Sequence, residues 1–287
     1  MSAGAPMAGR CVVVTGAAQG LGRAIALRYA REGAGIAALD VDAEGLEALA
    51  REPLMAGRCL ALACDVTDAN ACERAIGAAI ARFGGVDVLV ANAGISHRSA
   101  FAATAPAVIR KVVEVNFFGA VNCTHAALAS LRARRGGIVA ISSVAGFAPL
   151  IARTGYSASK HALHGFFDTL RTEVEPLGVR VTIVCPSFTD TAIDRHALGG
   201  DGGAAPAEKR VVGRLATPEE VADALVDGVR SRRRNVLPTA VSRGAWWLSR
   251  LAPDVYDRVM RRGQAGDFAH HAAAREGGAE AAFRAPR

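Results

Sequence analysis

A tyrosine and a lysine four residues apart, Tyr156 and Lys160, could together act as a general base. They open a stretch of helical character, so this spacing puts the phenol and the ammonium on one helix face. A free tyrosine has a pKa of about 10, and lowering it to about 7 takes roughly 4 kcal/mol of preferential phenolate stabilisation. A cation about 4 Å away at an effective dielectric constant of about 20 supplies an energy of that order. The pair therefore predicts proton exchange with a substrate hydroxyl.

A glycine-rich turn near the N-terminus predicts a phosphate-binding loop. It follows a short apolar run and precedes a helical pattern that reaches about residue 31. Missing side chains let a pyrophosphate approach the backbone at the positive end of a helix. We therefore expect a dinucleotide to contact Gly16, Gln19, Gly20, Leu21 and Gly22.

Asp40 ends the second apolar run, roughly 20 residues beyond the glycines. A carboxylate there can accept hydrogen bonds from both hydroxyls of an adenosine ribose, and it would repel a 2′-phosphate. Neither Gln19 nor Val41 is basic, so nothing at these positions favours that phosphate. The sequence thus favours NAD over NADP, while Asp42 is expected to cap the next helix.

Short apolar runs alternate with helical segments along most of the chain, as in repeated strand–helix units. Seven strands are expected at residues 11–15, 36–40, 59–64, 86–91, 137–142, 180–185 and 235–238. Their continuous apolar character predicts a doubly wound, seven-stranded parallel sheet with helices on both faces, a single α/β domain of Rossmann type over residues 8–240. Asp65 and Val66 follow the third strand, and Asn92, Ala93 and Gly94 follow the fourth, so both groups should line the same crevice.

Taken together, these motifs resemble the short-chain dehydrogenase/reductase family over roughly residues 8 to 240. The shared positions are the Thr-Gly-x-x-x-Gly-x-Gly turn, Asn92-Ala-Gly94, Ser143 and Tyr156-x-x-x-Lys160. The resemblance implies that Ser143, rather than Ser142, hydrogen-bonds the substrate oxygen, and that Asn116 holds a water between the active site and the lysine.

The resemblance also implies further contacts with the cofactor. Lys160 would contact the nicotinamide ribose, and Thr191 would lie near the carboxamide, with Pro186 on the same loop. The family usually has Pro-Gly after the sixth strand, whereas this chain has Pro186-Ser187, which puts that loop's conformation in question. Family members associate through two long helices, so a homodimer or homotetramer is expected.

The expected activity is hydride transfer between NAD and a secondary alcohol or its ketone, with a hydrophobic substrate. Two alternatives remain. One is a carbonyl or 3-oxoacyl reductase working with NADPH, and the other is a catalytically silent regulatory protein of the same fold. Retention of Asn116, Ser143, Tyr156 and Lys160 argues against the silent protein.

The net charge of +7 is local, because residues 230–262 hold nine arginines against Asp254 and Asp257. The rest of the chain is balanced, so we expect no nucleic-acid partner. Residues 241–264 predict a basic amphipathic helical extension. It would close the substrate pocket or pack on a neighbouring subunit; peripheral membrane contact through residues 241–262 is the alternative.

Several other segments carry weaker expectations. The glycine-rich residues 198–206 predict a mobile surface loop or a lid, and residues 265–287 a disordered tail. His97 and Arg98 are expected to form a solvated pair, and no spaced His/Cys/Asp cluster predicts a metal site. Without a spanning segment or secretory signal, the expected location is the cytoplasm, with membrane association as the alternative.

Overall fold

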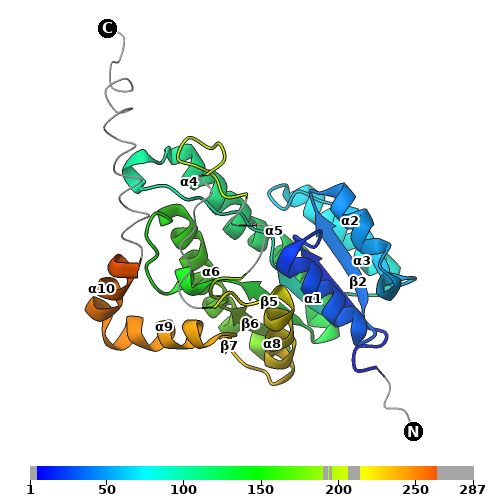
Figure 1. Ribbon diagram of the computed structural model, residues 1–287. Helices are drawn as coiled ribbons and strands as arrows, with labels where there is room; N and C mark the ends of the chain where they lie inside the picture. Colours follow the sequence, from blue (N-terminus) through cyan, green and yellow to red (C-terminus); the bar gives the residue numbers. More distant parts are fainter. Residues whose placement is uncertain (1–4, 190–192, 194–195, 206–213, 264–287) are drawn as a thin grey trace.

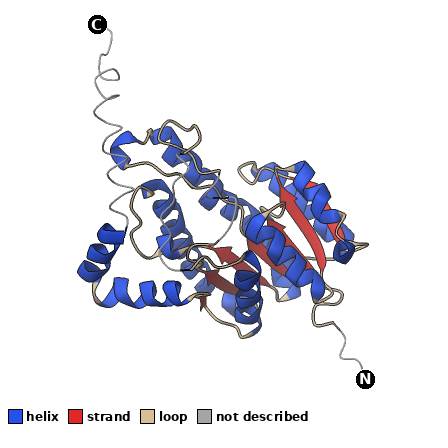
Figure 2. Ribbon diagram, viewed as in Figure 1, coloured by secondary structure: helices blue, strands red, loops and turns tan. Residues whose placement is uncertain are grey.

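Seven parallel strands form one sheet in the order β3-β2-β1-β4-β5-β6-β7 (Figures 1 and 2). The computed structural model describes residues 5–189, 193, 196–205 and 214–263. The strands are β1 (Cys11–Thr15), β2 (Gly35–Asp40), β3 (Cys59–Ala63), β4 (Val88–Ala91), β5 (Gly137–Ile141), β6 (Arg180–Val184) and β7 (Asn235–Val236). The predicted doubly wound sheet is confirmed, with every strand inside its predicted run except for one added residue in β2.

Alternate residues of the central strands enter two separate cores. Val12 and Val14 of β1 belong to one core, whereas Val13 of the same strand belongs to the other. All three side chains are fully buried, since helices cover both faces of the sheet. This double burial is the reason why the strands appear in the sequence as continuous rather than alternating apolar runs.

The helices are divided between the two faces (Figure 1). One core takes apolar residues from α1 (Gly20–Arg31), α2 (Ala43–Ala50) and α8 (Pro218–Arg230). The other takes them from α3 (Ala69–Phe83), α5 (Gly119–Arg134) and α6 (Thr154–Val174), and α4 (Pro106–Val113) packs on α6. Short turns complete the order: η1 (Pro53–Met55), η2 (Phe101–Ala103), the π-helical η3 (Glu114–Phe118), η4 (Val144–Gly146) and η5 (Glu175–Leu177).

Two helices follow the sheet, α9 (Ala240–Leu251) and α10 (Pro253–Gly263). Thr239 and Ser242 begin α9 with reciprocal hydrogen bonds between side chain and backbone, which satisfy N–H groups that have no partner within the helix. The two helices form a hairpin at the end of the molecule remote from α2 and α3 (Figure 1). No helix in the described ranges has the length and apolarity needed to cross a membrane.

The glycine-rich segment was expected to be a mobile loop. Its described residues, 198–205, form hydrogen bonds with the loop after β4. Leu198 donates to the Ser96 carbonyl at 2.9 Å and accepts from the Arg98 N–H at 2.8 Å. Gly200 accepts from the Ala105 N–H at 2.8 Å. These backbone hydrogen bonds hold the segment in place, although its glycines provide few side chains for packing.

Asp87, immediately before β4, joins three parts of the fold. Its carboxylate is 4% exposed and accepts hydrogen bonds from the Cys11 N–H at 2.9 Å and from Nη2 of Arg134 at 3.1 Å. These bonds connect the start of β1 with the end of α5.

We expect Asp87→Ala to lower the free energy of unfolding by about 3 kcal/mol, because it leaves the buried Cys11 N–H without this acceptor and removes the partner of Arg134. Urea denaturation measures this change. Asp223→Ala is the matched control, since Asp223 also pairs with an arginine, Arg28, but is 60% exposed. Equal effects of the two substitutions would contradict a special role for Asp87.

Candidate active site

A cavity of about 610 Å³ lies at the carboxyl edge of the sheet. Every described residue that the sequence predicted to bind a cofactor lines it: Gly16, Gln19, Gly20, Leu21, Gly22, Asp40, Asp65, Val66, Asn92, Ala93, Gly94, Tyr156, Lys160 and Pro186. Thr191 lies outside the described residues, and its neighbour Thr189 is part of the wall. The predicted positions thus share one cavity, of a size usual for small-molecule sites.

Hydrogen bonds fasten the turn after β4 to the glycine turn after β1. The Thr15 hydroxyl accepts from the N–H groups of Asn92 and Ala93 at 3.0 and 2.9 Å. The Asn92 side chain in turn donates to the carbonyls of Thr15 and Gly16 at 2.8 and 3.1 Å. A Cβ at Gly22 would lie only 1.9 Å from the Gly16 carbonyl oxygen, so this packing requires glycine.

Asp40 lines the cavity at the end of β2, three positions away from β5 in the strand order. Its carboxylate accepts from the Ala18 N–H at 2.9 Å and from the Asp42 N–H at 3.1 Å, which fixes its orientation beside the glycine turn. Gln19 and Val41 both line the wall near it, and Val41 is 70% exposed. Asp42 caps α2 by accepting from the Gly45 N–H, as predicted.

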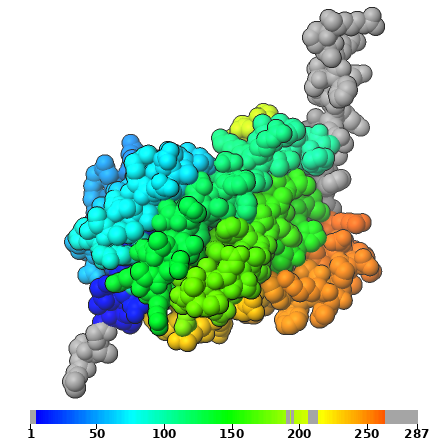
Figure 3. Space-filling view, turned by 180° about the vertical axis from the view of Figure 1, so that it is seen from behind, coloured from blue at the N-terminus to red at the C-terminus, as the bar shows by residue number. Residues whose placement is uncertain are grey.

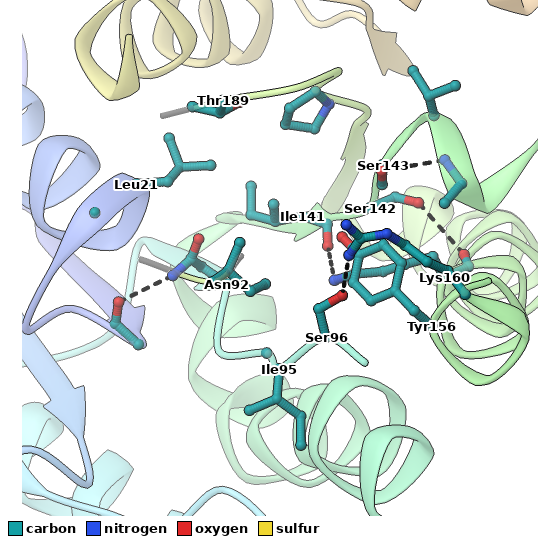
Figure 4. Close-up of a pocket in the computed structure, with 18 of the residues that line it drawn as sticks. Leu21, Asn92, Ile95, Ser96, Ile141, Ser142, Ser143, Tyr156, Lys160 and Thr189 are labelled. Atoms are coloured by element: carbon teal, nitrogen blue, oxygen red, sulfur yellow. Dashed lines mark hydrogen bonds between the residues drawn. The ribbon is translucent and has the colours of Figure 1, made fainter. Parts of the chain in front are cut away.

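Three of the four predicted catalytic residues, Ser143, Tyr156 and Lys160, lie together in the cavity wall (Figure 4). Ser143 begins η4 just beyond β5, and its hydroxyl accepts from the Ala145 N–H at 3.2 Å. The adjacent Ser142 is buried, and its hydroxyl lies 3.4 Å from the Lys160 carbonyl at the side of α6. Tyr156 is half-buried in the first turn of α6. The more accessible Ser143 is therefore the better placed of the two serines to meet a substrate.

Lys160 is buried in the wall of the cavity. Its Nζ donates to the Ile141 carbonyl at 2.8 Å and lies 5.7 Å from the centre of the Tyr156 ring. Burial lowers the pKa of Lys160 to about 8. The ammonium therefore remains the major form at neutral pH, so the cation required beside the phenol is available.

Asn116 lies behind the wall, on a π-helical turn. This turn, η3, separates α4 from α5, and such turns often accompany functional sites. The side chain, 1% exposed, accepts from the Ile95 N–H at 2.7 Å and donates to the Ser159 hydroxyl at 2.9 Å. It thereby connects the loop after β4 to the helix that carries Tyr156.

Two polar residues of the wall, Arg153 and Ser96, belong to no sequence motif and had no predicted role. Arg153 precedes α6 and donates to the Ser96 hydroxyl at 2.7 Å, and both side chains are buried. The prediction of a solvated pair at His97 and Arg98 is wrong, since they are 0% and 5% exposed. Burial, together with the charge of Arg153, lowers the pKa of His97 to about 4.

The α9–α10 hairpin forms one wall of the cavity. It contributes Val241, Ala245, Leu248, Tyr256, Val259 and Met260. The Ser187 hydroxyl bonds to the Thr239 hydroxyl, the cap of α9, at 2.8 Å. The serine that replaces the family's usual glycine therefore ties the loop after β6 to the start of the hairpin. Of the alternatives for this segment, the structure supports closure of the pocket.

Comparison with known proteins settles the family. The short chain dehydrogenase profile matches residues 10–199. The chain is also 37% identical to dehydrogenase/reductase SDR family member 7B of Bos taurus, over 87% of this chain and 79% of that protein. The chain belongs to the short-chain dehydrogenase/reductase family. A relative from Anopheles gambiae, dehydrogenase/reductase SDR family protein 7-like, is 33% identical over 88% of this chain and 83% of its own length.

Two solved structures of dehydrogenases have the same fold. An alcohol dehydrogenase from Thermococcus sibiricus, complexed with 5-hydroxy-NADP, is 28% identical with a TM-score of 0.67, over 77% of this chain and 90% of its own. A family member from Burkholderia phymatum, in complex with NAD, is 22% identical with a TM-score of 0.77, over 87% of this chain and 95% of its own.

We expect Lys160→Met to move the ascending limb of the kcat/KM profile for alcohol oxidation upward by about two pH units or more. The sign follows because loss of the cation destabilises the phenolate and raises the pKa of Tyr156. The measurement is the initial rate across a pH series. Lys111→Met, which removes an exposed lysine from α4, should leave the limb in place; equal shifts would contradict the assignment.

Proposed function

We propose that this dehydrogenase oxidises a hydrophobic secondary alcohol, or reduces its ketone, with NAD as its cofactor. The observation that carries the proposal is that one cavity is lined both by Asp40, at the end of β2, and by Tyr156 of α6. The glycine turn and the Asn92 turn line the space between them, as a dinucleotide-binding site requires.

Residues on this chain fit the cofactor along its length. Gly16, Gly20 and Gly22 leave room at the N-terminus of α1 for the pyrophosphate. Asp40 would accept hydrogen bonds from the adenosine ribose, and Lys160 would contact the nicotinamide ribose. When bound, the nicotinamide would take up or release the hydride.

Tyr156 removes the proton of the substrate hydroxyl during oxidation and returns it during reduction. Ser143 hydrogen-bonds the substrate oxygen and stabilises its developing charge. The Lys160 ammonium favours the phenolate, and a water held by Asn116 would pass the proton from Lys160 to solvent. The contacts of Asn116 with Ile95 and Ser159 also fix the position of the helix that holds the tyrosine.

The substrate end of the cavity supports a hydrophobic substrate. Its lining includes Leu150, Ile193, Leu248, Val259 and Met260. Besides the catalytic residues, the polar lining includes Arg153, Ser96 and His196, and Arg153 would donate to a hydrogen-bond acceptor on the substrate. A largely apolar molecule with such an acceptor near its reacting carbon suits this lining.

Subunit association and location are proposals that rest on the family and the sequence. We propose a homodimer or homotetramer formed through α5 and α6, located in the cytoplasm unless a membrane surface recruits it. Light scattering of the purified protein measures the size of the assembly. A monomer at all concentrations would contradict the association.

Tyr156→Phe should lower turnover by orders of magnitude while NAD binding is retained, because it removes only the phenolic oxygen. Steady-state rates with a panel of secondary alcohols, together with NADH titration by fluorescence, measure the two effects. Near-normal turnover in the variant would contradict the role of Tyr156. An inactive wild-type protein that binds NADH would favour the silent regulatory alternative.

Wild-type protein should bind NADH more tightly than NADPH, and Asp40→Ala should weaken NADH binding roughly tenfold by removing two hydrogen bonds. Calorimetric titration of both cofactors against both proteins measures the preference. Glu44→Ala, which removes a nearby exposed carboxylate outside the cavity, is the matched control. Tighter NADPH binding by the wild type would instead support the carbonyl or 3-oxoacyl reductase.

A further inference from the structure

The α9–α10 hairpin has two apolar faces, and only one of them faces the protein. On the inner face, Ala245 and Tyr256 pack with Ala148, and Leu248 and Met260 pack against this cluster. Trp246 rests edge-on against Phe147 with ring centres 4.8 Å apart, and the Arg250 guanidinium lies over its ring. These contacts hold the hairpin firmly on the body of the enzyme.

The outer face exposes large apolar side chains. Trp247 is 61% and Leu251 77% exposed, one turn apart on α9. Val255 and Val259, one turn apart on α10, are 40% and 52% exposed. In the space-filling view the hairpin, in orange, stands at the end of the molecule away from the N-terminal half (Figure 3). Exposed apolar residues clustered on one element, unlike scattered single ones, indicate an interaction surface.

The hairpin that carries this outer face is strongly basic. The hairpin carries five exposed arginines: Arg243, Arg250, Arg258, Arg261 and Arg262. Its only acidic residues are Asp254 and Asp257. A tryptophan and aliphatic residues beside arginines suit the boundary of a lipid bilayer, where the apolar groups insert and the cations meet acidic headgroups.

A second copy of this chain fits the same surface poorly. A symmetric dimer would place the same patch on both partners, so the arginines of one hairpin would face those of the other. An anionic lipid surface has the opposite charge and also accepts the apolar side chains. Charge complementarity therefore favours the membrane over self-association.

The cavity reaches the surface on the same helix. Val259 lines the cavity and is also 52% exposed, so it stands at an opening, and the neighbouring Met260 belongs to the wall. An apolar substrate dissolved in the bilayer could therefore enter beside α10 without crossing water.

We propose that the outer face of the α9–α10 hairpin docks on an anionic lipid surface and that a lipid-soluble substrate enters the cavity past Val259. The docking depends only on the surface itself. The entry route rests on the proposed dehydrogenase function.

Docking is tested by co-sedimentation of the full chain with phosphatidylcholine vesicles that contain or lack phosphatidylserine. Wild-type protein should sediment only with the anionic vesicles, and less so as salt is raised. Arg261→Gln with Arg262→Gln should weaken binding roughly thirtyfold, from about 1 kcal/mol for each arginine. Trp247→Gln with Leu251→Gln should weaken it at least about tenfold, because two large apolar groups no longer insert.

Leu177→Gln is the matched control, because Leu177 is 44% exposed on η5, before the amino end of β6 and away from the hairpin. It should bind vesicles as the wild type does.

In a Trp246→Phe background, Trp247 is the only tryptophan, and its emission should shift to the blue with anionic vesicles. Wild-type protein that fails to sediment at low salt, or hairpin variants that bind normally, would overturn the docking. The docking would also be overturned if the wild-type protein formed a dimer and Trp247→Gln abolished that dimer.

Entry is tested with two secondary alcohols, one short and water-soluble, the other long-chain and carried in anionic vesicles. The Trp247→Gln, Leu251→Gln variant should lose at least about tenfold in kcat/KM for the second alcohol only, in proportion to its weakened docking. If the substitutions changed kcat/KM for both alcohols by the same factor, entry from the lipid would be overturned. Vesicle binding without any dehydrogenase activity would instead show that docking holds and the proposed function fails.

Discussion

The fastening of the Asn92 turn to Thr15 and Gly16 is the constraint on which the cavity depends. These two turns follow β1 and β4, adjacent strands whose connections leave in opposite directions across the sheet. The Thr15 hydroxyl and the Asn92 side chain together hold the two loops in contact. Because they are held in contact, Gly16 and Gly22 have no space for side chains, and the resulting bare backbone suits a pyrophosphate.

Regular features of the sequence predicted the sheet and the cavity. Buried strands and the glycine turn leave local patterns, and parallel strands bring their carboxyl ends to one edge regardless of the details between them. For this reason residues as distant as Asp40 and Tyr156 could be assigned to one cavity. The π-helical turn at Asn116 left no such pattern, because a single widened turn changes the helical repeat too little to be seen in the order of apolar residues.

Tertiary contacts determined what the sequence could not predict. His97 and Arg98 are polar residues in a loop and would ordinarily be solvated, yet Leu198 pairs with this loop and covers it. Arg153 is buried in the wall because Ser96, far away in the sequence, accepts its hydrogen bond. The amphipathic pattern of the last two helices indicated an apolar face, but it could not specify whether that face would meet the cavity or a partner.

The burial of the Lys160 ammonium carries a cost to stability. Burial lowers the pKa of its ammonium to about 8, below the value that an unfolded chain would give it. Between these two values the unfolded state binds more protons, so stability increases as the pH rises through this window, and at neutral pH the buried charge disfavours folding. The Ile141 carbonyl offsets part of this penalty. A buried charged lysine with a purely structural role would cost stability with no functional benefit. A cation beside Tyr156 is what the proposed proton transfer by the phenol requires.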